Sequence, residues 1–276
     1  MDNQSKTINR LPVTRKALYK DILRNRWRTL LACSSLMLLF LLPLLTASLI
    51  KDYMVLNLLS DAEYFSNGLF TEIGAIRFRS INFIFLLVNS LCIIVLFVGF
   101  CGIFHIFRQL TWSEGISFWS DFKKGILQNI WLFLRYSLLV VLLYFVTWSL
   151  IYFANNLLFA FISLGLATFV FIPLIVLGMY YSVIYDSTLR QRLNNVTLLY
   201  IKNTPFILGV SLLFEAFFFI EIIPAVYFIV KLLVLLLSFF LIFPLIILYG
   251  SLVTAHIFDK DININHHKDI YRKGLY

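Results

Sequence analysis

Charged residues are scarce in this 276-residue chain: Asp, Glu, Lys and Arg make up 13% of it, whereas hydrophobic residues make up 61%. Soluble domains carry about 25% charged and about 45–50% apolar residues, so the composition excludes an ordinary soluble protein. No polar stretch is long enough to bury a core of its own, the longest being residues 1–28 and 51–80. We therefore expect an all-α membrane protein without a soluble domain.

Recognisable chemical motifs are lacking as well. Cys33, Cys92 and Cys101 lie in or beside apolar runs without CxxC spacing, which argues against a disulfide framework or a metal site. The sequence has no HExxH motif and no phosphate-binding glycine loop, and Gly250-Ser251-Leu252-Val253 lacks the second glycine of a nucleophile elbow. We predict a non-enzymatic protein with no catalytic residue, no cofactor and no bound metal.

What the chain does contain is six apolar runs, each of about the 20 residues that a bilayer crossing requires. They predict a six-transmembrane-helix bundle within a domain at residues 29–256, with spans at 30–50, 81–107, 130–154, 157–184, 205–222 and 227–254. Residues 51–80 are expected to form an outer loop that lies against the membrane interface, with residues 257–276 as a polar tail.

Residues 1–28 hold eight basic side chains, with Leu18, Ile22 and Leu23 at helical spacing among them. This pattern predicts an amphipathic segment on the cytoplasmic membrane surface, its cations facing anionic lipid. A docking site for an acidic partner is the alternative.

Basic residues outnumber acidic ones by 23 to 14, a net charge of +9. With the N-terminus inside, the predicted cytoplasmic segments hold eight, three, three and four of them, whereas the outer loops hold Lys51, Arg77 and Arg79. This asymmetry fits the positive-inside rule and places both termini in the cytoplasm. Because their positions explain the excess charge, we expect membrane lipids and no nucleic acid as partners.

Two segments of the chain resemble each other. Ile172-Pro173-Leu174-Ile175-Val176-Leu177 in the fourth span matches Phe243-Pro244-Leu245-Ile246-Ile247-Leu248 in the sixth. Gly125–Asn129, before the third span, pairs at a similar separation with Leu199–Asn203, before the fifth, and Asp21–Asn25 fits the same frame. The pattern favours three repeated helical hairpins, each led by a basic amphipathic interfacial segment. Chance similarity among Leu-, Ile- and Phe-rich segments is the alternative.

Glu215 and Lys231 are ionisable residues within predicted spans, at similar distances from the turn at Pro224. Because charges inside a bilayer are expensive, such residues are candidates for function. We predict an intramembrane ion pair between the two, of the kind that a proton-coupled transporter uses. A purely structural pair, or side chains that extend to the interface, are the alternatives.

A basic, aromatic segment precedes the third span. Aromatic and basic side chains together are typical of the headgroup level, and we predict a lipid or partner interface, termed the collar, at Trp112, Trp119, Phe122, Lys123 and Lys124. Small residues allow close approach of membrane helices, a role that we assign to Gly99, Gly102, Gly178 and Gly250.

From Phe118 onward the chain resembles the YesL-like family of bacterial membrane proteins, a family of unknown activity. The resemblance rests on four segments: Phe118-Trp119-Ser120-Asp121-Phe122-Lys123-Lys124, Tyr185-Asp186-Ser187-Thr188-Leu189, Leu193-Asn194-Asn195 and Lys202-Asn203-Thr204-Pro205-Phe206. It implies a bacterial plasma-membrane protein that assists a carbohydrate ABC transporter. We accordingly expect an accessory or scaffold subunit with ABC transporter subunits as partners, the alternative being a small-solute transporter that uses Glu215 and Lys231.

Overall fold

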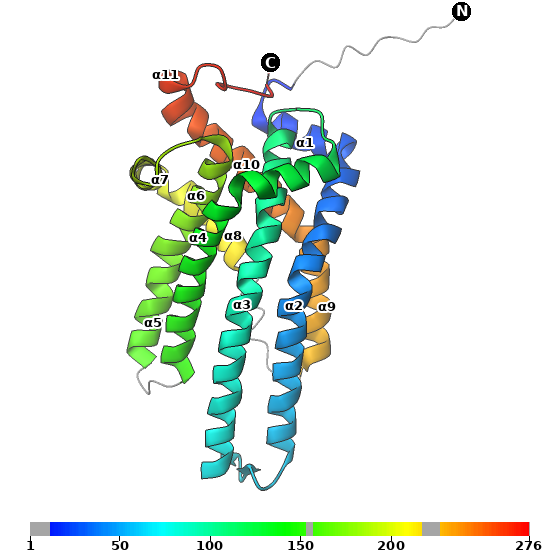
Figure 1. The fold of residues 1–276 in the computed structure, drawn as a ribbon, viewed down its shortest axis with the longest axis vertical. Coiled ribbons are helices and arrows are strands. Elements are labelled where there is room, and N and C mark those ends of the chain that lie inside the picture. The colour runs from blue at the N-terminus through cyan, green and yellow to red at the C-terminus, as the bar shows by residue number, and fades with distance from the viewer. Residues whose placement is uncertain (1–11, 153–156, 217–226, 276) are drawn as a thin grey trace, which may run out of the picture.

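The computed structural model describes residues 12–152, 157–216 and 227–275, which form a bundle of long helices (Figure 1). The short helix α1 (Arg15–Asn25) and the C-terminal residues lie at one end of the bundle, here called the terminal end. A two-stranded hairpin lies at the opposite end, here called the hairpin end.

Two antiparallel helices, α2 (Trp27–Ser60) and α3 (Glu72–Thr111), span the full length of the bundle. Strands β1 (Phe65–Ser66) and β2 (Leu69–Phe70) join them through Asn67 and Gly68, both with positive φ, which is the conformation that two-residue hairpin turns require. The predicted outer loop at residues 51–80 is therefore wrong: most of it is helical. Hydropathy marks the apolar part of a helix, and these two helices continue beyond it.

Helix α4 (Phe118–Tyr152) packs antiparallel to α3. It includes all of the collar residues except Trp112, which caps the end of α3, although the collar was expected only to precede the third span. The rings of Phe104 and Phe133 meet edge to face with centroids 5.7 Å apart, and Asn89 donates a hydrogen bond of 3.2 Å to the Tyr144 hydroxyl further along. The two helices therefore stay in contact over most of their length.

The next two long apolar segments are each interrupted by a π-helical turn. The first runs α5 (Leu157–Leu166), η1 (Ala167–Phe171) and α6 (Ile172–Ile184). The second runs α9 (Phe228–Leu237), η4 (Ser238–Ile242) and α10 (Phe243–Phe258). Pro173 and Pro244 lie in the first turn of α6 and α10, where a missing N–H is tolerated, and the π turn directly precedes each of them.

Between these segments, α7 (Leu189–Lys202) and α8 (Thr204–Glu215) meet at an angle of 103°. Thr188 and Gln191 form a capping box at the start of α7, and Pro205 lies in the first turn of α8. The predicted fifth span coincides with α8 as far as Glu215. Its part from residue 217 onward, and the turns expected at 155–156 and 223–225, lie outside the described residues.

Five of these helical segments are long and apolar enough to cross a membrane, and the bent α7–α8 pair would make a sixth. The five are Trp27–Ser60, Glu72–Thr111, Phe118–Tyr152, Leu158–Ile184 and Ile229–His266. Their length and composition are compatible with a multi-pass membrane protein, and the expected all-α class is confirmed.

The C-terminal residues fold back onto the terminal end rather than forming a solvated tail. Helix α10 continues through η5 (Asp259–Asn263) into α11 (Ile264–His266). Asp259 accepts a hydrogen bond of 2.7 Å from Arg15 of α1 and one of 3.1 Å from the main-chain N–H of Arg272. The Tyr185 hydroxyl, whose pKa is raised by burial, donates a hydrogen bond to the side-chain oxygen of Asn263 in η5. These contacts hold α1, η5 and the C-terminal residues together.

Candidate functional site

A buried ion pair joins α2 to α9. Lys231 Nζ lies 2.9 Å from Asp52 Oδ2, and both side chains are almost fully removed from the surface. Sequence reasoning missed Asp52 because it assigned this residue to an outer loop. The predicted partner, Glu215, forms no ion pair with Lys231 in the described part of the chain, so the partner predicted for Lys231 was wrong. The continuation of the helical apolar pattern through Leu58, which is buried, was the signal that α2 extends past Asp52.

Glu215 is the last residue of α8 and is 3% exposed. Its carboxyl oxygen Oε1 is buried and has no hydrogen-bond partner among the described residues. Because buried polar atoms are ordinarily hydrogen-bonded, an orphaned carboxyl oxygen is a notable feature of this interior.

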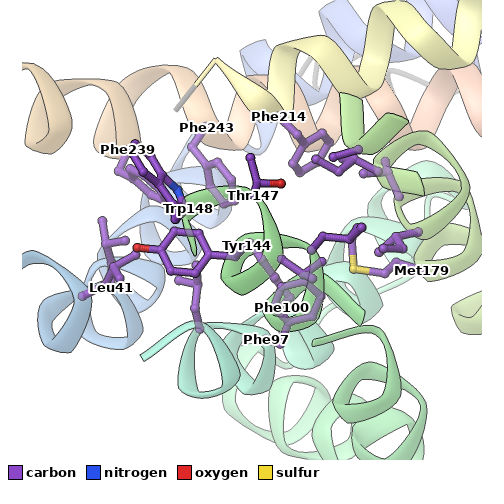
Figure 2. A pocket seen from close by; sticks show the side chains of 18 of the residues that line it. Leu41, Phe97, Phe100, Tyr144, Thr147, Trp148, Met179, Phe214, Phe239 and Phe243 are labelled. Carbon is purple, nitrogen blue, oxygen red and sulfur yellow. The ribbon is translucent and has the colours of Figure 1, made fainter. Parts of the chain in front are cut away.

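An apolar cavity of about 190 Å³ lies between the helices of the bundle. Figure 2 shows aromatic side chains from several helices around it, including Phe97, Phe100, Tyr144 and Phe243. Both π turns border it, η1 through Ala167 and η4 through Phe239. An apolar cavity of similar volume stays dry and accepts small apolar molecules, so this cavity suits an apolar ligand.

Few polar groups face this cavity. The labelled polar side chains are Tyr144, Thr147 and Trp148, all from α4 (Figure 2). Tyr144 accepts a hydrogen bond from Asn89, and the Thr147 hydroxyl lies 3.0 Å from that of Ser163. A sugar would need several convergent donors and acceptors, and this lining does not supply them.

The collar residues separate into two groups. Phe122 is buried beneath the Phe40 ring, with centroids 6.1 Å apart, and Trp112 carries Lys273 Nζ 4.0 Å above its ring centroid. Both therefore pack within the protein. Trp119 is 67% exposed, and Lys123 and Lys124 are exposed on the following turn of α4.

The four glycines singled out from the sequence all lie at close contacts between helices. A Cβ atom would lie 2.7 Å from the Phe40 ring at Gly99 and 2.2 Å from the Phe122 ring at Gly102. At Gly178 and Gly250 it would lie 2.7 Å and 2.4 Å from the hydroxyl oxygens of Tyr136 and Tyr180. A side chain at any of the four positions would displace a packed ring or hydroxyl.

No cluster of three or more His, Cys, Asp or Glu side chains suitable for a metal ion exists among the described residues. Comparisons with known proteins found no family model, no curated protein and no solved structure that matches this chain.

Proposed function

We propose that the protein is a non-enzymatic accessory or scaffold subunit of the bacterial plasma membrane, with six crossings and both termini in the cytoplasm. Its partner would be a transport complex, such as the subunits of a carbohydrate ABC transporter. The observation that carries this proposal is the pairing of an exposed aromatic and basic surface with an apolar interior. The side chains of Trp119, Lys123 and Lys124 are exposed on the outside of the bundle. The residues that line the central cavity, in contrast, are not suited to binding a polar solute.

The proposal is tested by purifying the tagged protein from its native membrane in mild detergent and identifying the co-purifying subunits by mass spectrometry. Replacing Trp119 and Lys123 by Ala should reduce the amount of co-purifying partner at least about tenfold, because aromatic and cationic side chains are often hot spots of protein interfaces. The matched control replaces Trp27 and Arg28, a second exposed aromatic and basic pair. Retention of the partner by the first variant, or equal loss in the control, would refute this docking surface.

A second candidate is a proton-coupled transporter of small solutes that uses Glu215 and Lys231. It is favoured by the buried Glu215 carboxyl group with its orphaned oxygen and by the buried Lys231–Asp52 pair. Replacement of Glu215 by Gln should then abolish uptake into reconstituted vesicles while leaving the purified protein folded. Unchanged uptake in that variant would eliminate the ion-coupled mechanism.

A further inference from the structure

A second, larger hollow lies at the terminal end of the bundle. This groove has a volume of about 1130 Å³ and is bordered by α1, α8, α10 and the C-terminal residues. Its walls are fixed to one another: Arg15 Nη2 lies 2.7 Å from Asp259 Oδ2, and Arg272 Nη2 donates to the Val13 carbonyl oxygen. The groove is therefore a built feature of the fold, formed by segments from both ends of the chain.

One part of the groove is apolar. Phe206 of α8 and Tyr249 of α10 line it and are 64% and 47% exposed, and Leu252 and Val253 continue the same surface along α10. Both helices belong to segments that are apolar enough to cross a bilayer. Large exposed apolar side chains on such helices are suited to contact with acyl chains.

Another part of the groove is cationic. Four basic side chains line it, together with one carboxylate, and that carboxylate, Asp259, already pairs with Arg15. Lys16 and Lys260 are both exposed and form no ion pair with any residue in the described ranges. The groove thus presents uncompensated positive charge next to an apolar surface.

We propose that this groove binds one anionic phospholipid. Lys16 and Lys260 contact the headgroup phosphate, while the acyl chains lie along Phe206, Tyr249 and Val253. A free phosphate ion would use only the cationic part, and an acidic peptide would leave the exposed aromatic side chains without a counterpart. An anionic lipid matches both parts at once, which is the pattern of basic pockets that recognise lipid headgroups.

The experiment uses the full-length protein in detergent and follows lipid binding by native mass spectrometry. Phosphatidylglycerol and phosphatidylcholine with identical acyl chains are titrated in parallel. Each Lys near the headgroup strengthens lipid binding by a factor of about 5, so replacing both Lys16 and Lys260 by Gln should weaken phosphatidylglycerol binding about 25-fold. The matched control replaces Arg79 and Lys268, two exposed basic residues that do not line the groove, by Gln and should leave the affinity within about twofold.

Two further measurements separate the apolar from the cationic contribution. Replacing the exposed Tyr249 by Ala should weaken both lipids by a similar factor, and excess inorganic phosphate should fail to displace the bound lipid. Equal affinity for the two lipids, an equal loss in the Arg79 and Lys268 control, or displacement by phosphate would overturn the proposal. Binding of polyglutamate at the affinity of phosphatidylglycerol would instead assign the groove to acidic proteins.

Discussion

Replacing Lys231 by Met tests the buried ion pair with Asp52. Met keeps most of the apolar volume of the Lys side chain but removes its charge, so the Asp52 carboxylate stays buried without its partner 2.9 Å away. Removing one member of a buried pair typically costs about 3–5 kcal/mol, because the remaining charge has lost both its partner and its water. We expect the free energy of unfolding to fall by that amount.

The double variant Asp52→Leu, Lys231→Met removes both charges and should recover most of this loss. Apolar side chains of similar volume often replace a buried pair with little cost, so the double variant should lie within about 1–2 kcal/mol of the unaltered protein. The coupling energy between the two positions would then be several kcal/mol, far above the deviation of about 0.5 kcal/mol that independent sites show.

Unfolding in mixed micelles, followed by tryptophan fluorescence, measures these free energies. The Glu215→Gln variant serves as the comparison: because Glu215 is not paired with Lys231 in the described structure, its effect should add to that of Lys231→Met. The reasoning would be refuted if Lys231→Met lost less than about 1 kcal/mol, or if Lys231 coupled to Glu215 and not to Asp52.

Three further predictions concern packing and the terminal end. Gly102→Val should destabilise the protein by about 1–3 kcal/mol, because its Cβ would lie 2.2 Å from the Phe122 ring. Gly209→Ala should not destabilise it, because no atom lies within 4 Å of that Cβ position. Thermal unfolding of the two variants measures the difference. Asp259→Asn should weaken the contacts of Asp259 with Arg15 and Arg272, which hold the C-terminal residues in place. Tryptic cleavage after residues 268, 272 and 273 should then become faster. An unchanged cleavage rate would show that Asp259 does not hold these residues. Thr188→Ala should remove the capping box of α7 and cost about 1 kcal/mol, measurable as faster hydrogen exchange at the start of that helix.

The positions of the apolar helices could be predicted from the sequence because burial in lipid or protein demands a long apolar run. The predicted ranges 30–50 and 81–107 both fall inside the observed helices α2 and α3. Their ends were harder to predict, because a helix that continues past the apolar run is polar on its exposed side. Asp52 illustrates this: it is a charged residue beyond the end of the run, yet it is buried.

Partners in the interior were harder to predict than positions. Glu215 and Lys231 were paired on the assumption that adjacent spans place them at the same depth, but Lys231 meets α2, which precedes it by about 180 positions in the chain. Phe122 was assigned to an outward-facing collar from its neighbours Trp119 and Lys123, although its ring fills the space left by Gly102. Contacts between distant segments depend on how helices pack, and hydropathy carries no information on that.

The resemblance between the fourth and sixth predicted spans has a local structural counterpart. Pro173 and Pro244 each lie in the first turn of an α-helix that directly follows a π turn, and no π turn occurs within α3, the corresponding helix of the first pair. The repeat of helical hairpins stays a prediction. Both π turns border the same cavity, which Phe239, Phe243 and Ile172 line but do not fill. Because a π turn is wider than an α-helical turn, the two π turns explain why this space is left open.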